Sequence, residues 1–302
     1  MNPRADSSGD GDEFALLAEN AAEIDLPWGG PPAVRRVATE VDGRTVSSLV
    51  WGTAPPRVVF LHGGGQNAHT WDTVVLALGI PAIAVDLPGH GHSSWREDRD
   101  YMPWTAADAV APVIRALAPD AEVVVGMSLG GLTTIRLTAT APDLVRRAVI
   151  VDVTPSVNLR QQTMTTAERG TTVLTAGPRR FDSREEMAAL AVAAAPGRPA
   201  SSVRRGVVHN SRPLPDGGFG WRYDQLSGPG DFAPLWEHVS TSAAPFTLVR
   251  GGASAFVADA DAAEFVRRSP STAVHVVDGA GHSVQSDRPL VLVEIIRSVL
   301  DG

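Results

Sequence analysis

The pattern G-x-S-x-G spans residues 126–130, between a run of valines and a second glycine at position 131. Glycines on both sides of Ser128 permit a tight strand-to-helix turn, which exposes the serine hydroxyl above the carboxyl end of a sheet. The N–H groups that follow lie at a helix N-terminus, where developing negative charge is stabilised. The pattern therefore predicts that Ser128 is a nucleophile.

A serine hydroxyl is a poor nucleophile until a base takes its proton. Of the eight histidines, His282 in "DGAGHSVQSDRP" directly follows the last predicted strand. This position puts its imidazole at the same edge of the sheet as Ser128. His90 and His92, in "LPGHGHSS", are a candidate metal pair without a clear third ligand, so we expect a glycine-supported turn there.

Acyl transfer also needs two fixed N–H donors for the oxyanion. The glycine-rich stretch "LHGGGQNAHTW" (residues 61–71) follows a predicted strand. The N–H groups of Gly64 and Leu129 are the candidate donors. We expect His62 to brace this loop by hydrogen bonding and not to act as a base.

Composition excludes several kinds of chemistry. The 302 residues contain no cysteine, so disulfides, thiol catalysis and zinc–thiolate sites are absent. All 26 basic residues are arginine, which excludes Schiff-base, Walker-lysine and pyridoxal chemistry. The net charge of −8 disfavours a nucleic-acid partner. We expect no cofactor and no metal.

The N-terminus is polar and acidic, unlike a signal peptide, and no run approaches the ~20 apolar residues of a membrane span. We therefore expect a cytoplasmic protein without a membrane partner. The sequence leaves the oligomeric state open.

Strand-like and helix-like segments alternate along most of the chain, which indicates a mostly parallel sheet with helices on both faces. The predicted strands are residues 44–52, 57–63, 80–89, 121–128, 146–155, 244–252 and 271–281. The predicted helices are about 67–78, 105–117, 129–141, 259–268 and 286–300, with a further short one within 13–24.

Residues 154–234 interrupt this alternation, because no buried strand is predicted there. About eighty residues are too many for an ordinary loop, so we expect a mostly helical cap over one end of the sheet. Trp221 and Tyr223, where this segment returns to the core, are candidate substrate-binding residues. We expect His209 and His238, in or near the cap, on the surface.

Five stretches occur along the chain in this order: "LHGGG", "AVDLPGHGHS", "VGMSLGGL", "VDVTP" and "GAGHSVQSDRP". Through these stretches and their order, the chain resembles capped α/β-hydrolase-fold proteins of the esterase, lactonase and carbon–carbon hydrolase kind. The resemblance covers about residues 34–300. It implies an α/β-hydrolase core with an eight-stranded sheet at residues 13–153 and 235–302, and a cap at 154–234 after the sixth strand. Residues 1–12 are a predicted disordered leader. The resemblance is specific for the fold and for a Ser–His pair, and weakly specific for substrate.

The chain departs from the family pattern at the catalytic acid. In most such proteins the acid lies in the turn after the next-to-last strand, as G-x-x-D-x-x-V, where this chain has Ser254 in "RGGASAFVADAD". We predict that Asp152, after the next strand from the nucleophile, is the acid instead. Asp259 or Asp261 is an alternative, although both fit helix N-terminal residues; a site without an acid is another.

These features predict a serine hydrolase that cleaves a carboxylic ester or lactone of a small apolar substrate through an acyl-enzyme. One alternative is a retro-Claisen hydrolase that cleaves a carbon–carbon bond of a diketone or ring-fission product with the same triad. The other is a non-catalytic ligand receptor on a hydrolase scaffold, for which the missing acid at position 254 is the only support.

Overall fold

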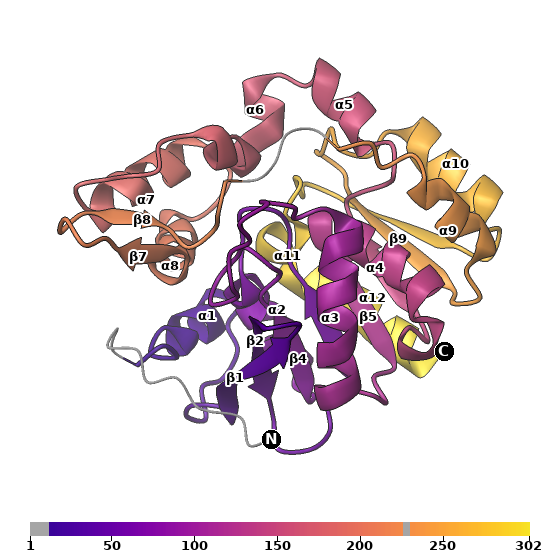
Figure 1. Ribbon diagram of the computed structural model, residues 1–302, viewed down its shortest axis with the longest axis horizontal. Helices are drawn as coiled ribbons and strands as arrows, with labels where there is room; N and C mark the ends of the chain where they lie inside the picture. Colours follow the sequence, from indigo (N-terminus) through magenta and orange to yellow (C-terminus); the bar gives the residue numbers. More distant parts are fainter. Residues whose placement is uncertain (1–11, 226–229) are drawn as a thin grey trace.

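The computed structural model describes residues 12–225 and 230–302, so the predicted leader lies outside the described residues except for Asp12. Eight strands form one sheet in the order β1-β2-β4-β3-β5-β6-β9-β10 (Figure 1). Strands β1, β2 and β4 pair antiparallel, and all other neighbours pair parallel. The strands are β1 (Val34–Val41), β2 (Arg44–Trp51), β3 (Val58–Leu61), β4 (Ala82–Val85), β5 (Val123–Met127), β6 (Ala148–Val151), β9 (Phe246–Gly251) and β10 (Ala273–Val277).

The structure confirms the eight-stranded α/β sheet, and the seven strands predicted individually all form. Strands β3, β4, β5 and β6 are buried along their whole length, as expected for β-branched and small apolar runs covered on both faces. Strand β1 was not predicted from its own pattern, because its "VRRVATEV" carries charged side chains and only two of its residues are buried.

Helices cover both faces of the sheet. One hydrophobic core lies between the sheet and α3, α4, α9 and α10, and the other between the sheet and α1, α2 and α12. The helices of the core are α1 (Leu17–Glu23), η1 (Ala68–Trp71), α2 (Asp72–Leu78), α3 (Pro103–Leu117), α4 (Leu129–Thr140), η2 (Pro142–Leu144), α9 (Leu235–Thr241), α10 (Asp259–Arg268), α11 (Val284–Asp287) and α12 (Pro289–Asp301). None of the helices in the described part of the chain is long and apolar enough to cross a membrane.

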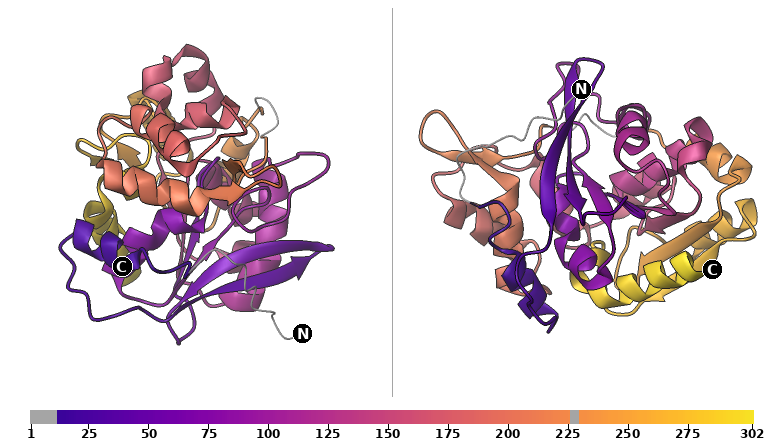
Figure 2. Two further views of the ribbon diagram at one scale, coloured as in Figure 1. Left: turned by 90° about the vertical axis from the view of Figure 1, so that its left-hand side faces the viewer. Right: turned by 90° about the horizontal axis from the view of Figure 1, so that it is seen from below.

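Residues 154–234, here called the insertion, lie between β6 and α9, and their described part contains short helices and a small hairpin. The elements are α5 (Val157–Thr163), α6 (Thr166–Arg169), η3 (Gly170–Ala176), α7 (Arg184–Ala193), α8 (Ala200–Asn210), β7 (Ser211–Pro213) and β8 (Phe219–Trp221). A separate apolar cluster, which includes Phe181, Met187, Val203 and Trp221, holds α7, α8 and the hairpin together. Figures 1 and 2 place these elements above one end of the sheet, with α8 next to α1. The boundaries 154 and 234 stay a prediction.

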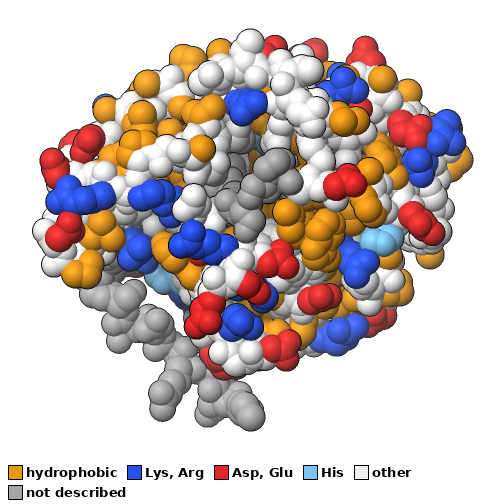
Figure 3. Space-filling model, turned by 45° about the horizontal axis from the view of Figure 1, so that its top comes forward, with side chains coloured by type: hydrophobic (Ala, Val, Ile, Leu, Met, Phe, Trp, Pro, Cys, Tyr) orange, Lys and Arg blue, Asp and Glu red, His pale blue; other side chains and the backbone are white. Residues whose placement is uncertain are grey.

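Arginine and acidic side chains both occur across the face that Figure 3 presents, with several arginines close together on its left side. This distribution agrees with the net charge of −8. Single-sign patches concentrate a strong field, whereas a mixed surface does not.

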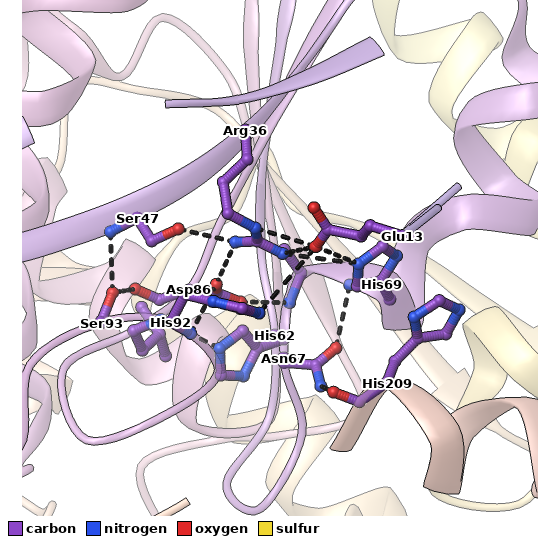
Figure 4. A network of polar contacts seen from close by, with 12 residues as sticks. Glu13, Arg36, Ser47, His62, Asn67, His69, Asp86, His92, Ser93 and His209 are labelled. Atoms are coloured by element: carbon purple, nitrogen blue, oxygen red, sulfur yellow. Dashed lines mark hydrogen bonds and ion pairs between the residues drawn. The ribbon is translucent and has the colours of Figure 1, made fainter. Parts of the chain in front are cut away.

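A buried polar network connects the N-terminal segment to the loop after β3 (Figure 4). Arg36 of β1 contacts Glu13 and lies 2.6 Å from Asp86, whose side chain is fully buried. Asp86 also accepts N–H bonds from Ala68 and His92. Arg36 and these bonds hold the pKa of Asp86 at about 2, against burial, which opposes its ionisation.

We expect Arg36→Met to lower the free energy of unfolding by about 3 kcal/mol, because it leaves the buried Asp86 carboxylate without its cation. The matched control is Arg57→Met, which removes the exposed Arg57–Glu122 pair and should cost no more than about 1 kcal/mol. Urea denaturation of both variants measures the difference. Equal losses would contradict a stabilising role for the buried pair.

Candidate active site

Ser128 forms the sharp turn between β5 and α4, with φ 51° and ψ −116°. Few residues other than glycine adopt this conformation. A Cβ atom on Gly126 would collide with the carbonyl of Gly130, and one on Gly130 would collide with the carbonyl of Leu61. The N–H of Ser128 donates to the carbonyl of Val151 on β6, at 3.1 Å. The two glycines of the motif are therefore required by packing, and they leave the serine side chain at the end of the sheet.

His282 lies in the loop after β10 and contacts both other members of the predicted triad. Its Nε2 is 3.1 Å from Ser128 Oγ, and its Nδ1 is 2.8 Å from Asp152 Oδ2. An ionised carboxylate only accepts hydrogen bonds, so Nδ1 carries the proton and Nε2 accepts from the serine hydroxyl. The ring of Phe256 stacks on the imidazole, with centroids 3.5 Å apart and planes at 11°. The imidazole is thus held on three sides.

Asp152 is fully buried at the end of β6 and, like Ser128, has φ 51°. Its Oδ1 accepts the N–H of Gly251 at 2.8 Å. Its Oδ2 accepts the hydroxyl of Ser254 at 2.5 Å in addition to the N–H of His282. These donors stabilise the charged carboxylate and set its direction.

Ser254 therefore contacts the predicted acid, Asp152. The sequence indicates only that position 254 lacks a carboxylate, and it does not show the contact of Ser254 with Asp152. This contact could have been predicted, because a residue at the family's acid position lies close to the histidine and so to any other carboxylate that binds that histidine. The stacking of Phe256 on His282 could not have been predicted in this way, since an apolar residue in a turn can pack against many partners.

Asp259 and Asp261, the alternative acids, face away from His282. Asp259 lies 2.6 Å from Arg250, and its side chain is 97% exposed. Asp261 pairs with Arg160 at 2.7 Å and accepts the N–H of Ala258, which begins helix α10. Both are helix N-terminal residues in this structure, and the suggestion that one of them reaches back to the imidazole is wrong.

The N–H groups of Gly64 and Leu129 have no hydrogen-bond acceptor among the described residues. The groups beside them are engaged, since Gly63 N–H donates to Gln66 and Gly65 N–H donates to His90. The backbone of Gly63 approaches Ser128 closely here, because a Cβ on Gly63 would lie 3.2 Å from Ser128 Cβ. Gln66 also lies 3.5 Å from the hydroxyl of Ser283, next to the imidazole. The Gly64 N–H in this loop therefore lies between two engaged N–H groups, whereas the Leu129 N–H belongs to the separate turn at Ser128, at the start of α4.

His62 and His90 brace this loop as neutral side chains. Leu87 N–H donates to Nε2 of His62 at 2.9 Å, and Nδ1 of His62 donates to the carbonyl of Gly63 at 2.8 Å. Burial lowers the pKa of His62, and burial lowers that of His90 to about 3. Both ring nitrogens of His90 are engaged, by Gly65 N–H and the carbonyl of Pro88. The structure therefore has the expected turn at "LPGHGHSS" and no metal pair at His90 and His92.

A cavity of about 670 Å³ lies between the core and the insertion, and both Ser128 and His282 line it. Its volume falls in the usual range for small-molecule sites. Trp221 and Tyr223 also line it and stack on each other, with centroids 5.5 Å apart. Their polar atoms bind the insertion itself, since Trp221 Nε1 donates to Pro178 and the Tyr223 hydroxyl to Leu174.

His209 was predicted on the surface, but it is only partly exposed. Its ring stacks on that of His69 from the core, and its Nε2 is buried. His69, Asp72 and His209 together form a group that is close enough to hold a metal ion. His69 and Asp72 are three residues apart and visible in the sequence, but the contact with His209 joins positions 140 residues apart.

The chain is similar to several known proteins. The model of the alpha/beta hydrolase family matches residues 58–295. Esterase Rv0045c of Mycobacterium tuberculosis (strain ATCC 25618 / H37Rv) is 57% identical over 292 residues, which cover 96% of each chain. A solved structure of the M. tuberculosis esterase, described with its transition metal inhibition, has a TM-score of 0.87 at 56% identity and covers 98% of this chain and 100% of that one.

A more distant relative is 2-(acetamidomethylene)succinate hydrolase of Mesorhizobium japonicum (strain LMG 29417 / CECT 9101 / MAFF 303099). It is 29% identical over 276 residues, which cover 88% of this chain and 96% of the relative. The family match and the first relative confirm the resemblance stated from the sequence motifs.

Asp152→Asn should lower kcat/KM for an ester by at least ~10², because an amide at this position favours the wrong imidazole tautomer. The same exchange costs about 10⁴ in turnover in a serine protease. Asp259→Asn is the matched control and should stay within about threefold, since it loses only an exposed helix-terminal charge. Initial rates on p-nitrophenyl butyrate test both variants. A large loss in Asp259→Asn with little loss in Asp152→Asn would overturn the assignment.

The 2.5 Å contact between Ser254 and Asp152 generates a second prediction. Ser254→Asp alone should lower kcat/KM, because two carboxylates would compete for one buried position. The double variant Ser254→Asp, Asp152→Asn should recover at least about tenfold over Asp152→Asn alone, since one carboxylate again faces His282. A double variant no more active than Asp152→Asn would show that the two strand ends are not interchangeable.

Proposed function

Because the chain belongs to the alpha/beta hydrolase family, we propose that it is an esterase with Ser128 as nucleophile, His282 as general base and acid, and Asp152 as the orienting carboxylate. The observation that carries this proposal is the continuous chain of hydrogen bonds from Ser128 through His282 to Asp152, at the wall of the cavity. The relationship to esterase Rv0045c supports an ester as the substrate.

The first half of the reaction forms an acyl-enzyme. Ser128 Oγ attacks the carbonyl carbon of the ester while its proton passes to Nε2 of His282. The buried Asp152 carboxylate stabilises the imidazolium that results. The free N–H groups of Gly64 and Leu129 bind the oxygen, which becomes negatively charged in the tetrahedral intermediate. The intermediate collapses when the imidazolium gives its proton to the leaving alcohol and the ester C–O bond breaks.

The second half releases the acid. A water molecule gives a proton to His282 Nε2 as it attacks the acyl carbon, and the same N–H groups bind the oxyanion again. The acyl–Oγ bond breaks, and Ser128 takes the proton back from the imidazolium. The products are a carboxylic acid and the free enzyme, so the cycle consumes one water and needs no other reactant.

The insertion acts in this proposal as the cap that shapes the substrate site. Trp221 and Tyr223 form an aromatic wall, and Leu174 and Val203 add apolar surface to the same cavity. This lining favours a carboxylic ester or a lactone of a small apolar substrate. A cytoplasmic location, without a nucleic-acid or membrane partner, stays a prediction from the composition.

Two alternatives predict different products or none. A carbon–carbon hydrolase with the same triad would release two carbon fragments from a diketone. The 57% identical relative is an esterase, so it does not support this alternative. A receptor would hold a ligand without turnover, but its only support, the missing acid at position 254, is weakened by the contact of Asp152 with His282. Labelling by a fluorophosphonate separates an activated serine from a receptor.

Ser128→Ala should lower hydrolysis of p-nitrophenyl butyrate at least about 10³-fold without lowering the melting temperature, because the hydroxyl acts only in the chemistry. His282→Ala should lose a similar factor, and the double variant should be no slower than either single variant, since the pair acts as a unit. The matched control is Ser286→Ala, another serine of the cavity wall, which should keep both activity and fluorophosphonate labelling. Parental activity in Ser128→Ala would disprove the assignment of the nucleophile.

A further inference from the structure

A second cluster of functional side chains lies where the insertion meets the core. His69 belongs to η1, Asp72 begins α2, and His209 belongs to α8. Each of the three offers one ligand atom, and these atoms all lie within 4.8 Å of one another. Figure 4 shows His209 reaching from the insertion to the side of His69. The proposed reaction uses none of these residues.

The contacts around His69 resemble those of a metal-binding histidine. Its Nδ1 is 2.8 Å from Asp72 Oδ2, and its Nε2 is 3.0 Å from Glu13 Oε1. A histidine that binds a metal through one nitrogen usually donates the other N–H to a carboxylate, which fixes the ring. Glu13 occupies that second position and is itself held by Arg36.

Two polar atoms of the cluster lack partners. Asp72 Oδ1 and His209 Nε2 are both buried and have no hydrogen-bond partner among the described residues. An unsatisfied polar atom in such a place is costly, so each one calls for an explanation. Both belong to the same small group, and both are of the kind that binds a divalent metal.

We propose that His69, Asp72 and His209 bind a divalent transition metal ion of the Zn²⁺ type. Two imidazoles and a carboxylate are a suitable ligand set for such an ion, and three protein ligands leave a coordination position for water. The ion takes the place of the proton between His69 Nδ1 and Asp72, while Glu13 keeps its bond to Nε2. The two imidazole rings are stacked at 3.8 Å and 13°, so they must tilt apart to face a common ion.

Metal binding here joins the core to the insertion. Asp72 begins α2 and His209 lies on α8, so the ion connects the two elements directly. Existing polar contacts already meet at this point, since Asn67 donates to the carbonyl of His209 and Asn210 donates to the carbonyl of Gly65. A bound ion should therefore raise the melting temperature by holding the insertion against the core.

The triad contains another imidazole beside a carboxylate, so the experiment removes it first. All proteins carry His282→Gln, are treated with EDTA and dialysed, and are then titrated with ZnCl₂ by calorimetry. In this background we compare His209→Gln with His275→Gln, the matched control on the half-exposed strand β10. We expect one equivalent of Zn²⁺ to bind to the background and to the control with the same affinity. His209→Gln should bind at least about tenfold more weakly and lose the Zn²⁺-dependent rise in melting temperature.

Melting temperatures in EDTA establish whether each variant folds, and Asp72→Asn, which keeps the side-chain shape, gives a second removal of a ligand. The absorption spectrum of Co²⁺ bound to the His282→Gln protein reports nitrogen ligation without any change in the cluster. The proposal is overturned if His282→Gln abolishes stoichiometric binding. It is also overturned if Asp72→Asn and His209→Gln both bind Zn²⁺ as tightly as their background.

Discussion

The parallel pairing of β5 with β6 is the constraint on which the candidate site depends. Met127 pairs with Val151, so the next residue on each strand, Ser128 and Asp152, emerges at the same edge of the sheet. Both adopt φ 51°, a conformation that costs energy for residues with a Cβ atom. The neighbouring strand β9 supplies Gly251 N–H to Asp152, and the loop after β10 supplies His282. Four adjacent parallel strands therefore contribute to one hydrogen-bonded unit.

The same sheet can present the predicted acid from a different strand end than in most of the family. Strands β6 and β9 are neighbours in the sheet, so the residues that follow them lie at the same edge. In this chain the carboxylate of Asp152 follows β6, and Ser254, in the turn after β9, donates its hydroxyl to that carboxylate. The site thus keeps a hydrogen-bonding group at both strand ends, although only one of them bears charge.

The features that local sequence patterns encode were predicted correctly. Buried apolar runs predicted the parallel strands, and glycines required by close packing marked the turn at Ser128. His282 followed from its place after the last strand. The sequence favoured Asp152 over Asp259 and Asp261, but it could not decide, because the choice depends on which side chains face the imidazole across different strands. Asp259 and Asp261 each pair with an arginine, and residue spacing along the chain does not reveal such pairs.

Contacts between distant segments account for the remaining differences. Strand β1 was not predicted because two arginines and a glutamate interrupt its apolar residues, and only its pairing with β2 identifies it as a strand. His209 was expected on the surface, since no local pattern indicates that α8 packs against η1. The separate apolar cluster of the insertion orients α8, and it thereby brings His209 to His69 and forms the walls of the cavity. Such placement depends on tertiary packing and not on any short stretch of sequence.

A crystal structure of the enzyme after reaction with a p-nitrophenyl phosphonate ester tests the account of the active site most directly. We predict a single covalent bond from Ser128 Oγ to phosphorus, with the phosphonyl oxygen within hydrogen-bond distance of the N–H groups of Gly64 and Leu129. His282 should still contact Asp152, and the remaining substituent should point toward Trp221 and Tyr223. An adduct on another residue, or a phosphonyl oxygen turned away from both N–H groups, would contradict the account.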